Sequence, residues 1–226
     1  MSRRTLRLSL FASALALSLT AFGHLVEDYL TGDAIVRWDV TFARWLHAHA
    51  DHPLVRFFDV VTLAGNSAVL IAVVAVVAVL YLRGTRANDA VVLVVALGGA
   101  ALVNALLKLA FQRPRPELAF IHLETYSFPS GHAAVSAATF TTLAYLTARR
   151  RASLVVRVAI GAAATAAIAF VGFSRLYLGA HYLSDVLAGA AFGLSWAFAC
   201  LLGYTYWEER DALNALPPRV RQIVLR

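Results

Sequence analysis

Charged residues are scarce in this chain of 226 residues: Asp, Glu, Lys and Arg make up 15% of it, whereas 60% of the residues are hydrophobic. This composition excludes an ordinary soluble domain and is typical of a membrane protein with several spans. The length leaves room for one membrane-embedded domain, residues 1–226, and for no sizeable second domain.

Cysteine is nearly absent, since Cys200 is the only one. A single cysteine excludes an intramolecular disulfide and makes a cysteine-based metal site unexpected. The sequence also lacks a Walker loop, a dinucleotide-binding glycine pattern and a carboxylate cluster suited to magnesium. We therefore expect neither a cofactor nor a bound metal.

Alternation of polar and apolar residues is missing too, and long apolar segments take its place. A helix needs about 20 residues to cross a bilayer, and without alternating strands only helices can span it. The predicted spans are residues 8–29, 67–82, 90–107, 130–148, 158–173 and 186–207. The first could instead be a cleaved signal peptide, because it contains small residues at cleavage-site spacing.

Residues 34–64 differ from the spans and predict a region that lies in the membrane interface. Apolar residues recur there at helical spacing up to residue 46, and Trp38 and Trp45 fit the level of the lipid headgroups. Asp39 falls outside the apolar stripe, as expected for a polar residue of an amphipathic helix.

Small residues in the last predicted span indicate close helix packing. Gly189 and Gly193 are four residues apart, a spacing that lets two helix backbones approach each other. Packing inside the bundle and a homodimer face both fit this spacing, so a homodimer stays a possible assembly.

The net charge of +7 could suggest a nucleic-acid partner, but the placement of the charges indicates a membrane topology. With six spans, 13 of the 20 basic residues fall on the side of the two termini. The positive-inside rule then predicts cytoplasmic termini for a multi-pass protein of the inner (plasma) membrane. No nucleic-acid partner is expected.

Three polar stretches interrupt the apolar background, and this topology places all of them on the side away from the termini. The first begins at Lys108, which closes a predicted span, and continues with Arg113-Pro114 and Arg115-Pro116. Taken alone, such residues are also typical of charge anchoring at a helix end.

The second stretch is Pro129-Ser130-Gly131-His132, directly before an apolar run. Pro, Ser and Gly in this order predict a helix start, where free backbone N–H groups can bind an anion. An ordinary helix cap followed by an interfacial histidine is the alternative.

The third stretch runs from Ser174-Arg175 to His181 and Asp185. If a helix begins near Gly179, the imidazole and the carboxylate lie one turn apart on the same face. Asp185 could then fix the tautomer of His181 and leave its other nitrogen free as a nucleophile or base. A structural ion pair at a helix start is the alternative.

In this order the three stretches resemble the signature of the type 2 phosphatidic acid phosphatase superfamily. The pattern is Lys, six residues, Arg-Pro; then Pro-Ser-Gly-His; then Ser-Arg, five residues, His, three residues, Asp. It is complete between residues 108 and 185. The short chain is similar to compact bacterial members, of the phosphatidylglycerophosphatase B and undecaprenyl pyrophosphate phosphatase kind. Soluble acid phosphatases and vanadium haloperoxidases share the pattern.

The resemblance implies an all-α membrane enzyme that hydrolyses a phosphomonoester or pyrophosphate of a lipid through a phosphohistidine. It implies His181 as the nucleophile, Asp185 as the group that orients it, and His132 as the acid and base. The phosphate-binding residues that it implies are Lys108, Arg115, Ser130, Gly131 and Arg175.

The cations among these residues could offset the charge of the phosphate, which fits phosphoryl transfer at a site without a metal. Phosphatidic acid, phosphatidylglycerol phosphate and undecaprenyl pyrophosphate remain alternative substrates, with the site facing the periplasm or cell exterior. Two other functions stay open: a lipid phosphoryltransferase, and a non-catalytic membrane protein that binds lipid phosphates.

Overall fold

The computed structural model describes residues 3–84, 86–121 and 123–214, and its regular elements in that part of the chain are all helical. The predicted all-α class is therefore confirmed. The helices are α1 (Arg3–Thr31), α2 (Ala34–Ala48), α3 (His52–Thr62), the short 3₁₀ helix η1 (Leu63–Gly65), α4 (Ser67–Arg83), α5 (Ala87–Phe111), α6 (Gly131–Ala148), α7 (Leu154–Tyr177) and α8 (Leu183–Asn214).

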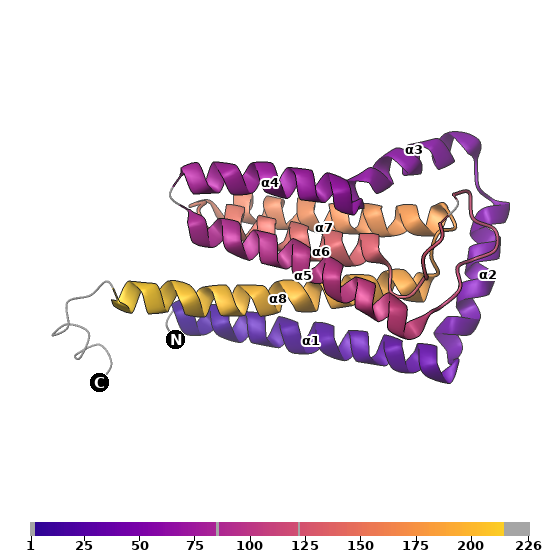
Figure 1. The fold of residues 1–226 in the computed structure, drawn as a ribbon, viewed down its shortest axis with the longest axis horizontal. Helices are drawn as coiled ribbons and strands as arrows, with labels where there is room; N and C mark the ends of the chain where they lie inside the picture. Colours follow the sequence, from indigo (N-terminus) through magenta and orange to yellow (C-terminus); the bar gives the residue numbers. More distant parts are fainter. Residues whose placement is uncertain (1–2, 85, 122, 215–226) are drawn as a thin grey trace.

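The long helices run side by side as a bundle, and α2 crosses one end of it (Figure 1). Helix α6 is the centre of the bundle, because it packs against α4, α5, α7 and α8. Helix α1 lies along α8, where Phe22 contacts Phe192 and the hydroxyl of Ser195 donates to that of Ser18 over 3.0 Å. The first described residues and the end of α8 lie at the end opposite α2 (Figure 1).

In the described part of the chain, four helical segments are long and apolar enough to cross a membrane: Thr5–Thr31, Ala87–Phe111, Leu154–Tyr177 and Leu183–Glu208. The segments His52–Gly65 and Ser67–Arg83 meet at a 46° bend and would make a fifth span together. Helix α6 is not among these candidate spans. Its neighbours cover it, so it need not face lipid.

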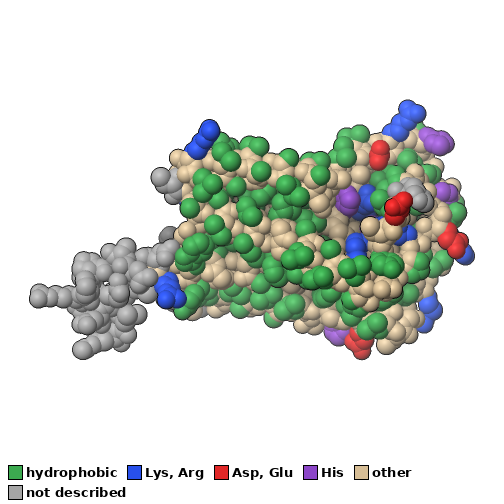
Figure 2. Space-filling model, viewed as in Figure 1, with side chains coloured by type: hydrophobic (Ala, Val, Ile, Leu, Met, Phe, Trp, Pro, Cys, Tyr) green, Lys and Arg blue, Asp and Glu red, His purple; other side chains and the backbone are tan. Residues whose placement is uncertain are grey.

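Charged side chains gather toward the ends of the molecule. On the face shown in Figure 2, the band between the ends is mainly hydrophobic. The apolar residues of this band are exposed to the surroundings, as with Leu102 and Val158, which are 63% and 62% accessible. An exposed apolar surface of this extent is expected for a protein solvated by lipid.

The helix boundaries follow local sequence signals. Helix α4 begins where the side-chain oxygen of Asn66 accepts hydrogen bonds from the backbone of Ala68 and Val69. Helix α5 ends at Gln112, whose φ of 48° is left-handed, and the proline-rich segment follows directly. Helix α6 begins after Ser130, as predicted.

One predicted boundary was wrong. The helix expected to begin near Gly179 begins at Leu183, and His181 therefore lies in the turn before α8. Gly179 has a φ of 66°, which ends α7 by reversing the backbone. An added side chain there would also overlap the Leu118 carbonyl, so this turn is packed against the loop that follows α5.

At the end of the bundle away from α2, the buried carboxylate of Asp89 joins α5 to α6 and α8. It accepts hydrogen bonds from Arg86 over 2.7 Å and from the guanidinium of Arg149 and the hydroxyl of Tyr204. Arg149 also donates to Glu208 over 2.7 Å. Since Tyr204 and Glu208 both belong to α8, this network fixes the orientation of that helix.

Gly189 and Gly193 face α6 inside the chain, so they are not a homodimer face. A side chain on Gly189 would overlap the carbonyl oxygen of Ser130, and one on Gly193 that of Ala134. The four-residue spacing therefore serves close packing of α6 against α8. The prediction of close packing inside the bundle is confirmed.

Gly193→Ala should therefore lower the stability of the protein by about 1–3 kcal/mol, because the added methyl must push two helices apart. Gly203→Ala on the same helix is the matched control, since no atom lies within 4 Å of its added Cβ. The melting temperatures of the two variants in detergent would be compared. Equal melting temperatures would contradict the packing described here.

Candidate active site

The three polar stretches meet at the end of the bundle that α2 covers. They come from the end of α5, the start of α6 and the turn between α7 and α8. The backbone N–H of Ser130 donates to the backbone oxygen of Asp185 over 2.9 Å. The ammonium group of Lys108 donates to the carbonyl of Tyr126 and, over 3.4 Å, to that of Ser127. Residues far apart in sequence thus form one site.

His181 is buried at the centre of this site, with 2% of its surface exposed. Its Nδ1 lies 3.5 Å from Oδ2 of Asp185 and 3.4 Å from the hydroxyl of Ser127. Its Nε2 lies 3.2 Å from Nη1 of Arg115. The distance to Asp185 is longer than a good hydrogen bond.

These contacts assign the tautomer of His181. A guanidinium can only donate hydrogen bonds, so the Nε2 that faces Arg115 must be the unprotonated nitrogen. The proton then resides on Nδ1, on the side of Asp185 and Ser127. The lone pair of Nε2 therefore points to the cations of the site, where a phosphate would bind.

The surroundings of His181 favour its neutral form. Burial lowers its pKa to about 3; Asp185 opposes this shift, and the cations Arg115 and Lys108 add to it. A lowered pKa means that the imidazole holds no extra proton at neutral pH. A neutral imidazole is the form that can act as a nucleophile.

Asp185 lies in the first turn of α8 and has several hydrogen-bond partners besides His181. It accepts from Nη1 of Arg113 over 2.6 Å, from the backbone N–H of Tyr182 over 2.9 Å and from the hydroxyl of Ser127. The carboxylate has no exposed surface. Its position is therefore fixed by contacts that do not depend on the histidine.

Arg113 connects Asp185 to α2. Its guanidinium donates to Asp185 and, over 2.8 Å, to Oδ2 of Asp39, which is 1% exposed. Burial alone would lower the pKa of Arg113, but Asp185 and Asp39 raise it above its ordinary value. Arg113 also lies over the rings of Tyr182 and Tyr29, 4.4 and 5.0 Å from their centroids.

The amphipathic pattern of α2 left open whether Asp39 is solvated or buried, and the structure buries its carboxylate. Its carboxylate enters the site and accepts hydrogen bonds from Ser184, from the backbone N–H over 2.9 Å and from the hydroxyl. Asp39 thereby caps the first turn of α8 from a different helix, where a negative charge is stabilising. The position of Asp39 outside the apolar stripe fits both a solvated and a buried carboxylate.

Four other side chains were also absent from the predicted site. Arg113 and Ser127 contact Asp185, and Ser184 joins Asp39 to Arg113 over 2.7 Å. The fourth, Thr62, accepts a hydrogen bond from Arg175 over 2.7 Å. Of these four residues, only Arg113 stood in one of the sequence motifs, because it is the first cation of the two Arg-Pro pairs.

The predicted phosphate-binding side chains surround the same space. Arg115 is held by the carbonyls of Thr125 and Ala180, both at 2.6 Å, and Arg175 is 2% exposed. In the described part of the chain, the hydroxyl of Ser130 and the Nε of Arg175 are buried with no hydrogen-bond partner. Unsatisfied donors of this kind would gain a partner from a phosphate oxygen.

Gly131 and His132 complete this arrangement at the first turn of α6. A Cβ on Gly131 would lie 3.2 Å from the side-chain nitrogen of Asn104 and 3.9 Å from Cε of Lys108, so a larger residue would narrow the space. His132 lies beside η1, because a Cβ on Gly65 would lie 3.4 Å from its Cβ and Cδ2. Thr62, the hydrogen-bond partner of Arg175, directly precedes η1.

A pocket of about 560 Å³ lies beside this cluster, between α2, the loop after α5 and the turn before α8. Arg115 and Tyr182 form part of its inner wall, and Val40, Ala43 and Arg44 line the side of α2. The walls of this pocket are partly polar and partly apolar, and a molecule that carries a phosphate would reach Arg115 through it.

Ser127→Ala should lower kcat for phosphate release about tenfold, because a hydrogen bond to a charged group is worth about 1.5–3 kcal/mol. The KM should change little, since the hydroxyl contacts Asp185 and His181 and lies behind the imidazole. Ser195→Ala removes another buried hydroxyl, far from this site, and is the control. An unchanged kcat in Ser127→Ala would contradict this role.

Comparison with known proteins finds related sequences. The sequence model of the PAP2 superfamily matches residues 89–209. Phosphatidylglycerophosphatase B of Bacillus subtilis is 30% identical over 140 residues, which are 59% of this chain and 67% of that protein. The lipid A 1-phosphatase of Rhizobium etli is 35% identical over 118 residues, 47% of this chain and 46% of its own length.

Two solved structures share the fold. The transmembrane PAP2-type phosphatidylglycerolphosphate phosphatase from Bacillus subtilis has a TM-score of 0.75 at 24% identity, covering 85% of this chain and 96% of that one. Aquifex aeolicus LpxE has a TM-score of 0.58 at 24% identity, covering 73% and 94%. At such identities, the likeness concerns the fold.

Proposed function

The chain belongs to the PAP2 superfamily, and on that premise we propose that it removes the phosphate from a membrane lipid through a phosphohistidine on His181. The observation that carries the proposal is the 3.2 Å contact between Nε2 of His181 and Nη1 of Arg115, at the place where three motifs converge. Lys108 and Arg175 add two more cations there.

In the first step of the proposed reaction, Nε2 of His181 attacks phosphorus and the bond to the lipid oxygen breaks. His132 gives that oxygen a proton, so the lipid leaves as an alcohol. In the second step His132 takes a proton from water, whose oxygen attacks the phosphohistidine and releases inorganic phosphate. Asp185 stabilises the positive charge that His181 carries between the steps.

The phosphate would be held by Lys108, Arg115 and Arg175 together with Ser130 and the backbone of Gly131. These groups match the charge that spreads over the phosphoryl oxygens in the transition state. The free hydrogen-bonding atoms of Ser130 and Arg175 support this assignment. The reaction would need no metal, since the cations supply the charge compensation.

Phosphatidylglycerol phosphate is the first substrate to test, because the relative named as a phosphatidylglycerophosphatase is covered over 67% of its length. Phosphatidic acid and undecaprenyl pyrophosphate remain candidates. Lipid A carrying a 1-phosphate joins them through the names of the lipid A 1-phosphatases. All four place a phosphate at the membrane surface and their chains in lipid.

The proposed setting is the inner membrane, with six spans if α6 and the bent pair α3–α4 are counted. Helix α2 would lie in the interface, where Trp38 and Trp45, 67% and 54% exposed, suit the headgroup level. The excess of basic residues at the other end supports cytoplasmic termini and a site that faces the periplasm or exterior. Residues 1–2 and 215–226, which include the termini, lie outside the described residues.

The test is phosphate release by the detergent-purified protein from each of these lipids, with and without a chelator. We expect release from phosphatidylglycerol phosphate that persists when the chelator is present. Loss of release with the chelator would contradict a metal-independent reaction. Transfer of labelled phosphate to a lipid alcohol, with none released, would establish the phosphoryltransferase alternative. Binding without turnover would establish the non-catalytic one.

A further inference from the structure

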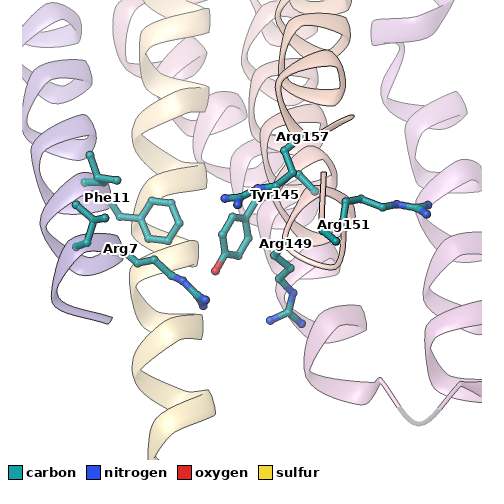
Figure 3. A pocket seen from close by; sticks show the side chains of 10 residues that line it. Arg7, Phe11, Tyr145, Arg149, Arg151 and Arg157 are labelled. Atoms are coloured by element: carbon teal, nitrogen blue, oxygen red, sulfur yellow. The ribbon is translucent and has the colours of Figure 1, made fainter. Parts of the chain in front are cut away.

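A second pocket lies at the opposite end of the bundle, between the start of α1, the end of α6 and the start of α7 (Figure 3). Its volume is about 670 Å³. Since α6 has 18 residues and rises 1.5 Å per residue, the pocket is about 25 Å from His132. Its lining contains four arginines, Arg7, Arg149, Arg151 and Arg157, and no acidic residue.

The positive charge of this pocket is only partly compensated. Arg149 donates to Asp89 and Glu208, which fix its guanidinium in place. Arg7, Arg151 and Arg157 form no ion pair with any carboxylate that the structure describes. The described part of the chain therefore supplies no counter-ion for these three arginines, and an anion would stabilise the pocket.

Tyr145 points to the same conclusion independently. Its hydroxyl and the Nε of Arg149 are buried, and neither has a hydrogen-bond partner among the described residues. Such groups are rare because each costs desolvation energy. In Figure 3, the Tyr145 hydroxyl and the guanidinium groups of Arg7 and Arg157 point into the space between α1 and α6, whereas Arg151 points away.

The apolar part of the lining indicates that the anion carries a hydrocarbon chain. Leu6, Leu10 and Phe11 form the α1 side of the pocket, and Phe11 contacts the ring of Tyr145 edge-on at 5.1 Å. Leu6 and Leu10 are 45% and 58% exposed, so the pocket continues into the apolar surface of the bundle. Free phosphate would satisfy the arginines but leave this apolar wall uncovered.

We propose that this pocket binds the phosphate headgroup of an anionic phospholipid that is not the substrate. Arg7, Arg149 and Arg157 contact the phosphate, Tyr145 donates its hydroxyl to a phosphate oxygen, and one acyl chain lies along Leu6 and Leu10. The lipid links α1 to α6 and α7. On the orientation proposed above, it comes from the inner leaflet.

The test measures the melting temperature of the purified protein in a neutral detergent. Dioleoyl phosphatidylglycerol should raise it by about 4 °C, as expected for a ligand that binds only the folded state. Dioleoyl phosphatidylcholine and inorganic phosphate are the comparison ligands. The shift should be lost in the double variant Arg7→Gln/Arg157→Gln. It should persist in Arg83→Gln/Arg210→Gln, which removes the same charge from exposed arginines at the same end of the bundle.

An equal shift in the two double variants would overturn the site, because general charge attraction would then explain it. An equal shift with inorganic phosphate would overturn the lipid assignment. If the Arg7→Gln/Arg157→Gln variant fails to fold, Tyr145→Phe decides the question: it should reduce the shift, and an unchanged shift would contradict the site. The measurement needs no substrate, so its failure leaves the proposed phosphatase activity untouched.

Discussion

The variant His181→Ala should lose phosphate release by a factor of about 10⁴ or more, the scale seen when a catalytic nucleophile is removed. It should nevertheless stay folded. Asp185 keeps its hydrogen bonds from Arg113, Tyr182 and Ser127 in this variant, so no unpaired carboxylate is left in the interior. Detergent melting temperature and phosphate release measure the two effects separately.

A labelled phosphoenzyme distinguishes a nucleophile from a residue that only positions the substrate. With substrate labelled at phosphorus, rapid quenching should trap an acid-labile, base-stable label on the wild-type protein. No label should form on His181→Ala. His132→Ala should still accept label from a substrate with a good leaving group, and it should release that label slowly because the base for the second step is missing. Retained turnover in His181→Ala would refute the nucleophile assignment.

Arg113→Gln should be the most destabilising substitution near the site. It leaves the buried carboxylates of Asp39 and Asp185 without their shared cation, and breaking a buried ion pair costs about 3–5 kcal/mol. A decrease of about 10 °C in melting temperature follows for a chain of this length. The rate of phosphate release should also fall in this variant, because Asp185 loses one of the groups that hold it beside His181.

Two comparison variants make this prediction specific. Arg37→Gln removes an exposed arginine from α2 and should change the melting temperature little. Asp39→Asn in the Arg113→Gln background removes one of the two unpaired charges, so the double variant should be more stable than Arg113→Gln alone. If Arg113→Gln and the double variant Arg113→Gln/Asp39→Asn melt at the same temperature, Asp39 does not depend on Arg113 for its charge compensation.

Much of this site could be predicted from the sequence because its parts are local signals. The Pro-Ser-Gly sequence starts α6, and the two Arg-Pro pairs cannot continue α5, so Gly131 and Arg115 fall in the expected places. The spacing of His181 and Asp185 also brings them together, although the turn before α8 differs from the helix start that was predicted. Local signals of this kind require no knowledge of the tertiary structure.

The parts of the site and fold that could not be predicted depend on contacts between segments that are distant in the sequence. Asp39 is separated from Ser184 by 145 positions, and Arg113 from Asp185 by 72. An acidic residue on an amphipathic helix gives the same pattern whether it faces water or a buried arginine. The six predicted spans depended on hydropathy alone, which cannot tell that α6 lies inside the bundle and is covered by its neighbours.

Helix α8 is held at both ends, by Asp185 in its first turn and by Tyr204 and Glu208 near the other end of the bundle. Each residue of an α-helix turns the chain by about 100°. The two ends must therefore keep a fixed rotation relative to each other, so the number of residues between Asp185 and Tyr204 is constrained as well as the identity of Gly189 and Gly193. Inserting or deleting one residue there would turn Asp185 away from His181 or Tyr204 away from Asp89, whatever its hydrophobicity.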